Sequence, residues 1–471
     1  MTGTDGHNQQ LRSFVPEIPA GLLRVGRDGL HLLLHPDRPE WLVVNEVGWE
    51  IARLCNGEMK VEGIARVLAA RYDIDQATAL SDVEGYLLHL SRARFLKSFI
   101  TDASPPERTT PESPLKLRRL HLNINENCNL RCAHCGVVDG TEKKGGFTKE
   151  KVLEIIDELS GTEGSSIAVS GGEPLLHKDI FPILEYASKK LSTSLSTNAT
   201  LIDEDRARRL ASIDIRLQIS LDGPDSETHD RVRGPGSFDR TLQGVKLLKE
   251  YGAVGRVAFF TTVLGHNIEK IPALITLASG LGVPSVRLLP VQRLGAAKRS
   301  WEDLSPAPEQ YLKLYTYLYR EMPPSTVDVS PGFQGFLLDI PDCSRWCRLG
   351  ETLAVDASGD IYPCSLMMHP DFLIGNIHKM TLEEAVGSEK LEGIINACSS
   401  REDTTEGCID CTWKNFCQAS CPGSVFFKSG SLWATDDLCE VRKKLYPEVI
   451  FEVAGKRMDS TLLRQSTDCE A

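Results

Sequence analysis

The middle of the chain alternates short apolar segments with longer amphipathic ones. Six apolar segments have the length and composition of strands: 119–124, 166–170, 192–197, 215–221, 257–263 and 285–289. The stretches between them place apolar residues at helical intervals, which predicts helices over 149–159, 180–191, 204–213, 238–251 and 268–281. Strands and helices in this succession predict an α/β fold, a partial (β/α)6 TIM-like barrel with functional residues at the carboxyl ends of its strands.

The first hundred residues have a different pattern, in which short strand-like segments precede helical periodicity. The apolar segments, separated by Gly, Asp and Pro, lie at 21–25, 30–34 and 41–44. Apolar residues then recur at helical intervals over 47–55, 61–72 and 77–91. Small strands followed by three helices predict a winged-helix-like α+β domain over 14–100. The following segment, 101–115, has four prolines and almost no apolar residues, so we expect a linker.

The end of the chain has little periodicity. A helical stretch at 308–319 closes the expected barrel region, 116–322, and after it only residues 382–397 have a long helical pattern. The region 341–445 is rich in cysteine, and we expect a loop-rich domain there. A domain of about 100 residues with so thin a core needs bound metal to hold it together. The polar residues from Gly455 onward are expected to fray.

Composition limits the functional classes. The 471 residues predict two to four domains, and 41% hydrophobic with 25% charged residues is typical of a globular chain. The net charge of −12 disfavours nonspecific binding to nucleic acid. The sequence has neither the roughly 20 continuous apolar residues of a membrane-spanning helix nor a secretion signal at its start. We therefore expect a cytoplasmic protein with no membrane or nucleic-acid partner.

The unusual number in this composition is 14 cysteines. Cysteines at short spacing in a reducing cytosol more often bind metal or do chemistry than form disulfides. Cys128, Cys132 and Cys135 follow the first predicted barrel strand at the spacing CxxxCxxC. Three thiolates on one loop can hold three irons of a cubane cluster and leave the fourth iron open to a substrate or cofactor. The alternative is a structural zinc site, which normally has four protein ligands.

This CxxxCxxC motif resembles that of the radical S-adenosylmethionine (SAM) superfamily, and the resemblance extends over the middle of the chain. It implies a 4Fe-4S cluster held by the three cysteines, with SAM bound to the unique iron. In that family one electron cleaves SAM, and the resulting 5′-deoxyadenosyl radical removes a hydrogen atom from the substrate. The resemblance also implies an electron donor, a ferredoxin or a flavodoxin with its reductase.

Further motifs of the same family end the next three predicted strands. They are Ser170-Gly171-Gly172-Glu173-Pro174, Ser196-Thr197-Asn198 and Ser220-Leu221-Asp222. The SAM contacts implied by the resemblance are His134, Gly171, Gly172, Glu173, Ser196, Asn198, Ser220 and Asp222. For the last two motifs, ordinary capping of the next helix is the alternative. Arg231 or Arg233 is a candidate for the SAM carboxylate, and Arg287 for substrate, SAM or an ion pair at the barrel rim.

A second set of cysteines follows in the C-terminal region: Cys343, Cys347, Cys364, Cys408, Cys411, Cys417, Cys421 and Cys439. Their spacing resembles the seven-cysteine signature of the SPASM domain, with Cys343 as an additional upstream thiol. Eight thiolates are enough for two closed 4Fe-4S clusters. By resemblance, Cys343, Cys347, Cys364 and Cys421 hold the nearer auxiliary cluster, and Cys408, Cys411, Cys417 and Cys439 hold the farther one. A two-zinc ribbon is the alternative.

Auxiliary clusters give electrons a path away from a substrate radical, which favours a net two-electron oxidation such as a thioether or carbon–carbon crosslink. Sulfatase-maturating relatives carry an aspartate directly after the cysteine that corresponds to Cys364. Here that residue is Ser365, whose hydroxyl is a far weaker base, so formylglycine formation is disfavoured. The remaining thiols, Cys55, Cys398 and Cys469, are expected to be spare, and Cys55 is expected in a core.

Residues 14–100 resemble the small PqqD-like domain of pyrroloquinoline-quinone biosynthesis, a RiPP recognition element that binds the leader of a ribosomal precursor peptide. The matching features are Pro16, Pro19, the helix start at Asn45, the Asn56-Gly57 turn and the closing helix at 87–95. The resemblance implies that the peptide adds as a strand to the sheet edge, for which 30–34 and 42–44 are candidates. A purely structural cap is the alternative, and the acidic chain disfavours DNA binding.

These motifs predict a radical SAM peptide maturase that binds a ribosomal precursor peptide and modifies it oxidatively. The alternative is a radical SAM enzyme acting on a non-peptide substrate, such as tetrapyrrole decarboxylation. A noncatalytic iron–sulfur carrier or zinc-stabilised scaffold is a third hypothesis. The sequence does not single out a catalytic acid or base.

Overall fold

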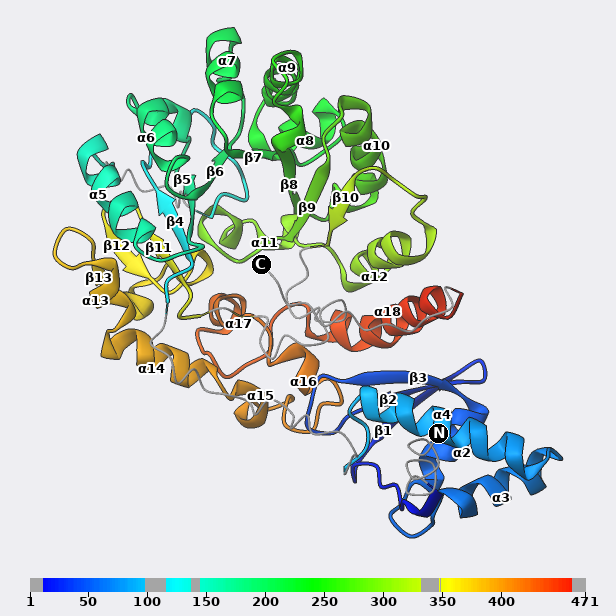
Figure 1. Cartoon of the computed structure of the whole chain (residues 1–471). Helices are drawn as coiled ribbons and strands as arrows, with labels where there is room; N and C mark the ends of the chain where they lie inside the picture. Colours follow the sequence, from blue (N-terminus) through cyan, green and yellow to red (C-terminus); the bar gives the residue numbers. More distant parts are fainter. Residues whose placement is uncertain (1–11, 98–115, 137–144, 332–346, 348, 460–471) are drawn as a thin grey trace, which may run out of the picture. The chain divides into compact units, whose positions relative to one another are not determined.

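The computed structural model describes residues 12–97, 116–136, 145–331, 347 and 349–459 (Figure 1). The predicted linker at 101–115, the predicted ligand Cys343 and the expected spare thiol Cys469 lie outside these residues. The chain divides into two compact units. The first unit comprises, among the described residues, 12–97 and 446–459. The second unit comprises the described residues from 116 to 445.

The N-terminal residues form an antiparallel sheet followed by three helices. The strands are β1 (Leu23–Arg27), β2 (Leu30–Leu34) and β3 (Trp41–Asn45), in the order β1-β2-β3. The helices are α2 (Glu46–Leu54), α3 (Val61–Tyr72) and α4 (Gln76–Arg92). This arrangement confirms the predicted α+β domain. Because β2 pairs with both neighbours, residues 30–34 are not an edge, and of the two candidate edge segments only 42–44 lies on one.

Side chains explain how this domain begins its helices and fills its core. The Asn45 side chain accepts a hydrogen bond from the Gly48 amide, and Asp75 accepts two at the start of α4, so both helices start at a capping residue. Leu33 and Val44 from the sheet pack with apolar residues of all three helices. Cys55 is fully buried in this core, as expected of a small apolar residue.

The second unit is built on a sheet of ten strands. Its parallel strands are β4 (Arg119–Asn123), β5 (Ser166–Ser170), β6 (Ser192–Thr197), β7 (Arg216–Ser220), β8 (Val257–Val263), β9 (Ser285–Pro290), β10 (Asp328–Ser330) and β11 (Thr352–Val355). Strands β4 to β10 lie side by side in chain order, and β11 pairs with the other edge of β4. The antiparallel strands β12 (Asp360–Tyr362) and β13 (Gly375–Asn376) complete the sheet.

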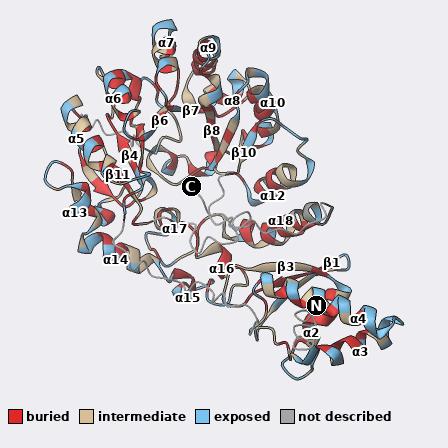
Figure 2. Ribbon diagram, in the orientation of Figure 1, coloured by how far each residue is buried: buried red, intermediate tan, exposed pale blue. Residues whose placement is uncertain are grey.

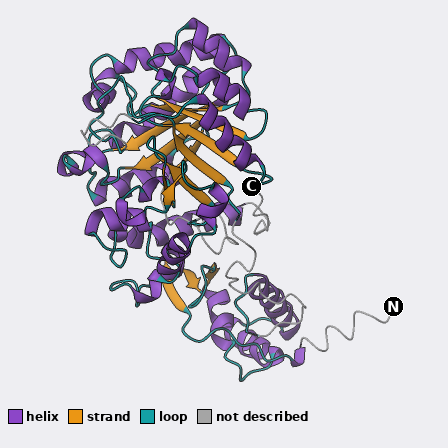
Figure 3. Ribbon diagram, turned by 90° about the vertical axis from the view of Figure 1, so that its left-hand side faces the viewer, coloured by secondary structure: helices purple, strands orange, loops and turns teal. Residues whose placement is uncertain are grey.

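The helices that follow the strands cover one face of this sheet (Figures 1 and 3). They are α5 (Lys149–Ser160), α6 (Ile180–Ala187), α7 (Glu204–Ser212), α8 (Ser226–Arg233), α9 (Ser237–Glu250), α10 (Ile271–Leu281) and α12 (Pro308–Thr316). The short helix α11 (Trp301–Leu304) follows β9, and its Trp301 packs with Val232 and Leu264. The predicted α/β fold is therefore confirmed. Helix α8 was not predicted, because its sequence, SETHDRVR, is almost entirely polar; Asp225 caps its start.

The two faces of the sheet differ in chemistry. Leu195 on β6 and Leu217 and Ile219 on β7 are fully buried. Figure 2 shows buried residues along the strands of the sheet. The alternate positions carry small or polar side chains that are only half buried, such as Ser196 and Gln218. Successive residues of a strand point to opposite faces, so the second face is the polar interior of an open barrel.

The cysteine-rich region contains more helix than predicted. Its helices are α13 (Leu382–Val386), α14 (Glu389–Cys398), α15 (Arg401–Thr404), α16 (Lys414–Cys417), α17 (Pro422–Ser429) and α18 (Cys439–Asp459). The helix predicted at 382–397 is interrupted at Gly387, after which Ser388 caps α14. Helix α18 was missed because Pro447 interrupts its pattern, and it extends past Gly455, where fraying was expected. No helix among the described residues is long and apolar enough to cross a membrane.

Candidate functional site

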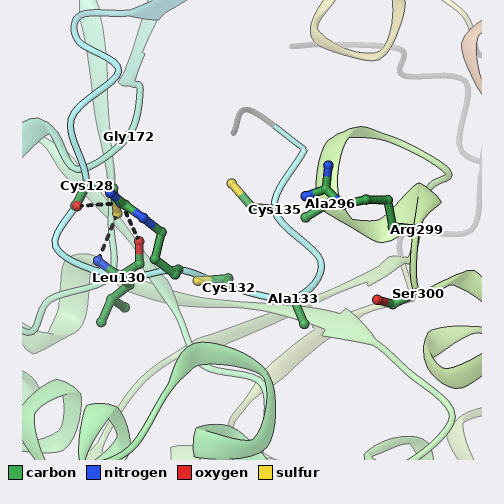
Figure 4. A pocket seen from close by; sticks show the side chains of 10 residues that line it. Cys128, Leu130, Cys132, Ala133, Cys135, Gly172, Ala296, Arg299 and Ser300 are labelled. Atoms are coloured by element: carbon green, nitrogen blue, oxygen red, sulfur yellow. Dashed lines mark hydrogen bonds between the residues drawn. The ribbon is translucent and has the colours of Figure 1, made fainter. Parts of the chain in front are cut away.

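The CxxxCxxC cysteines lie on the loop after β4, at the carboxyl end of that strand. Their loop borders a pocket of about 260 Å³ (Figure 4). The pocket is lined by Cys128, Leu130, Arg131, Cys132, Ala133, Cys135, Gly172, Ala296, Arg299 and Ser300. The loop is bound internally, because the Leu130 amide donates to the Cys128 sulfur over 3.4 Å and Arg131 donates to the Cys128 carbonyl over 3.1 Å. The three thiols therefore face one pocket, as the motif predicts.

Two glycines allow the cysteine loop to approach the end of β5. A Cβ atom on Gly171, which has a φ of +138°, would lie 2.4 Å from the Asn125 carbonyl oxygen. A Cβ atom on Gly172 would lie 2.3 Å from the Asn127 carbonyl oxygen. The Gly172 and Glu173 amides donate to these two carbonyls over 2.8 and 2.7 Å. The Gly-Gly-Glu motif thus binds the loop through its backbone, and only glycine permits that distance.

The Glu173 side chain points into the protein. It is 1% exposed, and it accepts hydrogen bonds from the Thr197 hydroxyl (2.6 Å) and from the Asn198 and Leu175 amides (2.8 and 3.1 Å). Burial raises the pKa of its carboxyl, while these donors act in the opposite direction. In this structure Glu173 therefore joins the ends of β5 and β6.

Asn198 extends this network to the first cysteine. Its side-chain amide donates to the Asn129 side-chain oxygen over 3.0 Å and lies 4.0 Å from the Cys128 sulfur. Its own oxygen accepts from the amide and the hydroxyl of Thr200 (2.9 and 2.7 Å). Asn198 is thus oriented by Thr200 and contacts the cysteine loop directly.

Asp222 forms a buried ionic network with Arg233 and His134. The carboxylate is fully buried and accepts from Arg233 Nε over 2.5 Å and from the Thr262 amide over 2.8 Å. His134 Nε2 lies 3.4 Å from the same carboxylate oxygen that binds Arg233. Arg233 also lies 4.0 Å from the Cys132 sulfur. Both carboxylate oxygens of Asp222 are thus bonded within the protein, and they orient Arg233 and His134 beside the cysteine loop.

The electrostatics of this network fix its charge states. Burial alone would raise the pKa of Asp222, but Arg233, His134 and His229 outweigh it and lower that pKa to about 2. Burial lowers the pKa of His134 to about 4, so its imidazole is neutral at pH 7. Burial raises the pKa of Cys132 to about 11, and Arg233 acts against that rise. Beside the cysteine loop the network therefore holds an anionic carboxylate and a guanidinium cation.

Most of the predicted SAM contacts do not line the pocket. Of the eight, only Gly172 is a lining residue among those that the structure describes. The Ser196 hydroxyl bonds to Gln218 over 2.6 Å, and Ser220 is half buried at the end of β7. Arg287 pairs with Asp328 on β10 over 3.0 Å, which is the rim ion pair considered for it.

The loop after β9 supplies part of the pocket and was missed in the sequence. Ala296 donates from its amide to the Cys135 carbonyl over 2.9 Å, and Arg299 and Ser300 line the pocket (Figure 4). Gly295 has a φ of +50°, and a Cβ there would lie 2.3 Å from the Cys135 carbonyl oxygen. A glycine shortly after the sixth predicted strand is the only signal in the sequence for this contact.

The same loop contacts the cysteine-rich region. Arg293 donates twice to the Asp437 carboxylate, over 3.0 and 3.1 Å, and lies 4.1 Å from the Trp301 ring centroid. The Ser424 hydroxyl, three residues after Cys421, donates to the Gln292 side chain over 2.5 Å. The loop after β9 and the segment that carries Cys421 are thus hydrogen-bonded to each other.

The cysteines of the C-terminal region fall into two groups by their mutual electrostatic effects. Burial raises the pKa of Cys347 to about 12, and Cys421 and Cys398 add to the rise. Burial likewise raises the pKa of Cys364, with contributions from Cys421 and Cys347. Cys398, expected to be spare, thus lies near the first group.

The second group centres on Cys408. Burial raises its pKa to about 11, and Cys417, Cys439 and Cys411 add to the rise. Buried thiols of this kind stay protonated until a cation such as iron replaces the proton, so both groups have the donor chemistry of a cluster site. Among the described residues no three His, Cys, Asp or Glu side chains are close enough together to bind one metal ion. A cubane cluster does not need such a group, because each of its irons takes only one cysteine.

Three protein-family models match the chain. The Radical SAM superfamily matches residues 122–278, the iron–sulfur cluster-binding SPASM domain matches 343–412, and coenzyme PQQ synthesis protein D (PqqD) matches 31–96. The chain is therefore a radical SAM enzyme that uses SAM and iron–sulfur clusters. More particularly, it belongs to the radical SAM enzymes that carry a SPASM domain, and it has a PqqD domain before the barrel.

Relatives and solved structures agree with this assignment. The mycofactocin maturase MftC of Mycobacterium tuberculosis is 29% identical over 322 residues, which cover 66% of this chain and 80% of the relative. The AdoMet-dependent heme synthase of Methanosarcina barkeri is 26% identical over 349 residues, 69% of this chain and 97% of the relative. The crystal structure of Streptococcus suis SuiB bound to S-adenosylmethionine is similar in fold, with a TM-score of 0.58, 16% identity and coverage of 89% of this chain and 99% of that one.

Proposed function

We propose that this protein is a peptide maturase. It binds a ribosomal precursor peptide through the domain at 14–100 and modifies it oxidatively, by a thioether or carbon–carbon crosslink, in the barrel at 116–322. The observation that carries the proposal is the union in one chain of a PqqD domain, a three-cysteine pocket and a SPASM domain with eight further cysteines. The similarity to a mycofactocin maturase supports it.

The proposed cluster ligands follow the two cysteine patterns. Cys128, Cys132 and Cys135 bind the SAM cluster, and their shared pocket supports that role. The nearer auxiliary cluster takes Cys343, Cys347, Cys364 and Cys421, and the farther one takes Cys408, Cys411, Cys417 and Cys439. When bound, SAM and its cluster supply a radical that removes a hydrogen atom from the substrate, and the auxiliary clusters accept electrons.

The residues around the pocket position the cysteine loop. Gly171 and Gly172 bind it through backbone contacts, and Asn198 contacts Cys128 from the end of β6. The Asp222–Arg233 pair holds a positive charge beside Cys132, where a guanidinium stabilises thiolate over thiol. The proposed SAM contacts remain those that the motifs predict, His134, Gly171, Gly172, Glu173, Ser196, Asn198, Ser220 and Asp222, and of these Gly172 lines the pocket. We add Arg299 from the pocket lining, because its cationic side chain suits a carboxylate.

The precursor peptide is proposed to add to the edge of β3. Among the described strands β3 pairs only with β2, so one row of its backbone groups is open to a new strand. Val43 on this strand is half buried, whereas Leu42 and Val44 face the core. A strand added here would gain backbone hydrogen bonds without disturbing the core.

The proposal is tested by co-expressing the protein anaerobically with short peptides encoded beside its gene and measuring the peptide mass. A crosslink removes two hydrogen atoms from the peptide, and the loss must disappear when Cys132→Ala removes a proposed ligand of the SAM cluster. An unmodified peptide, alongside active cleavage of SAM by the same preparation, rejects the proposal.

Decarboxylation of a tetrapyrrole is the second candidate, and the heme synthase similarity favours it. The PqqD match favours a peptide, because a tetrapyrrole offers no backbone to extend a sheet edge. The two are separated by incubating the reduced protein with SAM and coproporphyrin and measuring the porphyrin mass. Loss of carbon dioxide would establish the second candidate.

A further inference from the structure

One buried arginine of the cysteine-rich region, Arg401, has no carboxylate partner in the part of the chain that the structure describes. It begins α15 and is 1% exposed. Arg442 is equally buried, and its guanidinium pairs with the Asp436 carboxylate. The hydrogen bonds of Arg401 go to backbone carbonyls alone. Burying a cation costs free energy unless an anion lies nearby, so a negative charge close to Arg401 would stabilise the folded chain.

The Arg401 guanidinium holds two segments together through all three of its nitrogens. Nε donates to the Leu432 carbonyl over 2.7 Å, Nη1 to the Ser420 carbonyl over 3.0 Å and Nη2 to the Ala419 carbonyl over 2.7 Å. The planar fork of arginine matches such an arrangement, and a lysine ammonium does not. Two of these carbonyls belong to the short segment between Cys417 and Cys421.

That segment has an unusual backbone. Gln418, Ala419 and Ser420 have φ values of 49°, 54° and 65°, the left-handed region that costs free energy for residues other than glycine. A left-handed run persists only where surrounding contacts hold it. Arg401 binds two of its three carbonyls, and the Ser420 hydroxyl donates to Asp436. The turn thus sets the directions in which Cys417 and Cys421 leave it.

Arg401 also lies beside a proposed ligand of each auxiliary cluster. It binds the carbonyl of Ser420, which directly precedes Cys421, and the carbonyl of Ala419, which follows Cys417 by two residues. Cys421 and Cys417 belong to different proposed clusters, so the one guanidinium lies close to ligands of both.

We propose that Arg401 positions the turn between Cys417 and Cys421 and is the buried counter-cation of both auxiliary clusters. This inference rests on the ligand assignment given under the proposed function. A 4Fe-4S cluster with four thiolates is anionic, so it supplies the anion that no described carboxylate provides by pairing with Arg401. A fixed positive charge stabilises the reduced, more anionic state of a cluster and raises its reduction potential.

The test compares Arg401→Gln, which removes the charge and most of the fork, with Arg401→Lys, which keeps the charge alone. The full chain is reconstituted anaerobically, its iron and zinc are counted, and the auxiliary clusters are titrated with reductant while their electron paramagnetic resonance (EPR) spectra are recorded. Arg256→Gln is the matched control. Arg256 also donates to backbone carbonyls, those of Leu210 and Ala211 in α7 and of Ile215 after it, and none of these bonds reaches a cysteine-bearing segment.

We expect R401Q to lower the midpoint potential of the auxiliary clusters and R401K to restore it toward wild type. We expect R401K still to alter the EPR spectrum, because a lysine leaves the turn incompletely bound. R256Q should lower the melting temperature and change neither potential nor spectrum.

Wild-type potentials in R401Q overturn the charge role. If R401Q yields no folded chain, the positioning role is judged from R401K. A wild-type EPR spectrum and full iron content in R401K overturn that role. If the wild-type chain itself binds zinc, or only the iron of the SAM cluster, the assignment of the auxiliary-cluster ligands is wrong, and this inference is then wrong as well. That failure is visible before any variant is compared.

Discussion

Gly172→Ala tests whether the Gly-Gly-Glu motif acts by holding the cysteine loop. The added Cβ would lie 2.3 Å from the Asn127 carbonyl oxygen and 2.6 Å from its carbon, where real Cβ contacts stay beyond 3.0 Å. The neighbour is backbone and cannot swing aside, so the loop that carries Cys128 must move. The move strains the bonds from Gly172 to the Asn125 carbonyl and from Glu173 to the Asn127 carbonyl. Overpacking of this kind costs about 1–3 kcal/mol.

The displaced loop is expected to lose the SAM cluster while the auxiliary clusters stay. Reconstituted protein should then fall from about a dozen irons per chain to about eight and should no longer cleave SAM. Gly280→Ala is the control, because Gly280 lies in α10 with nothing within 4 Å of an added Cβ. Full iron content and normal SAM cleavage in G172A would refute the reasoning, since the loop would then tolerate a contact that the geometry forbids.

Three further predictions concern the buried network, the ligand set and the peptide edge. Asp222→Asn leaves the buried Arg233 guanidinium without its anion and should destabilise the anaerobic chain by about 3–5 kcal/mol, measured by urea unfolding; an unchanged transition would show that the carboxylate carries no charge there. Iron analysis should show that Cys343→Ala removes about four irons per chain and that Cys398→Ala removes none. The reverse result would make Cys398 the fourth ligand of the nearer auxiliary cluster, because its charge acts on Cys347 and that of Cys421 acts on it. Proline at Leu42 or at Val43 removes one N–H donor from β3, and the N–H groups of these neighbours point to opposite sides of the strand, so only one of them lies on the free edge. The proline variant that removes this free-edge donor should weaken binding of the leader peptide at least tenfold by fluorescence anisotropy and leave peptide-free SAM cleavage unchanged.

Much of the fold follows from the sequence because its elements are locally encoded. Strands β5, β6 and β8 bury every second residue, and they lie where the sequence pattern places them. The short strands β10 to β13 carry too few residues for any period to show. They form because each pairs with an edge already present: β10 with β9, β11 with β4, β12 with β11 and β13 with β12. Such pairing is tertiary, and no local pattern encodes it.

The candidate site follows the sequence less closely. The cysteine spacing encodes a shared pocket, because three thiols on one short loop must face the same space. The sequence predicts Glu173 and Asp222 as SAM contacts but does not predict their hydrogen bonds to Thr197 and Arg233, which lie 24 and 11 residues away. Arg299 and Arg401 were missed because their partners are distant in sequence and mostly backbone.

The central claim, that the chain is a peptide maturase, is tested most directly with purified components. The anaerobically reconstituted protein is incubated with SAM, a reductant and its precursor peptide, with and without the leader, and peptide mass and 5′-deoxyadenosine are measured together. The account predicts that the full precursor loses two hydrogen atoms in step with 5′-deoxyadenosine formation, and that the leaderless peptide is not modified. A full precursor that keeps its mass while 5′-deoxyadenosine accumulates would contradict the account.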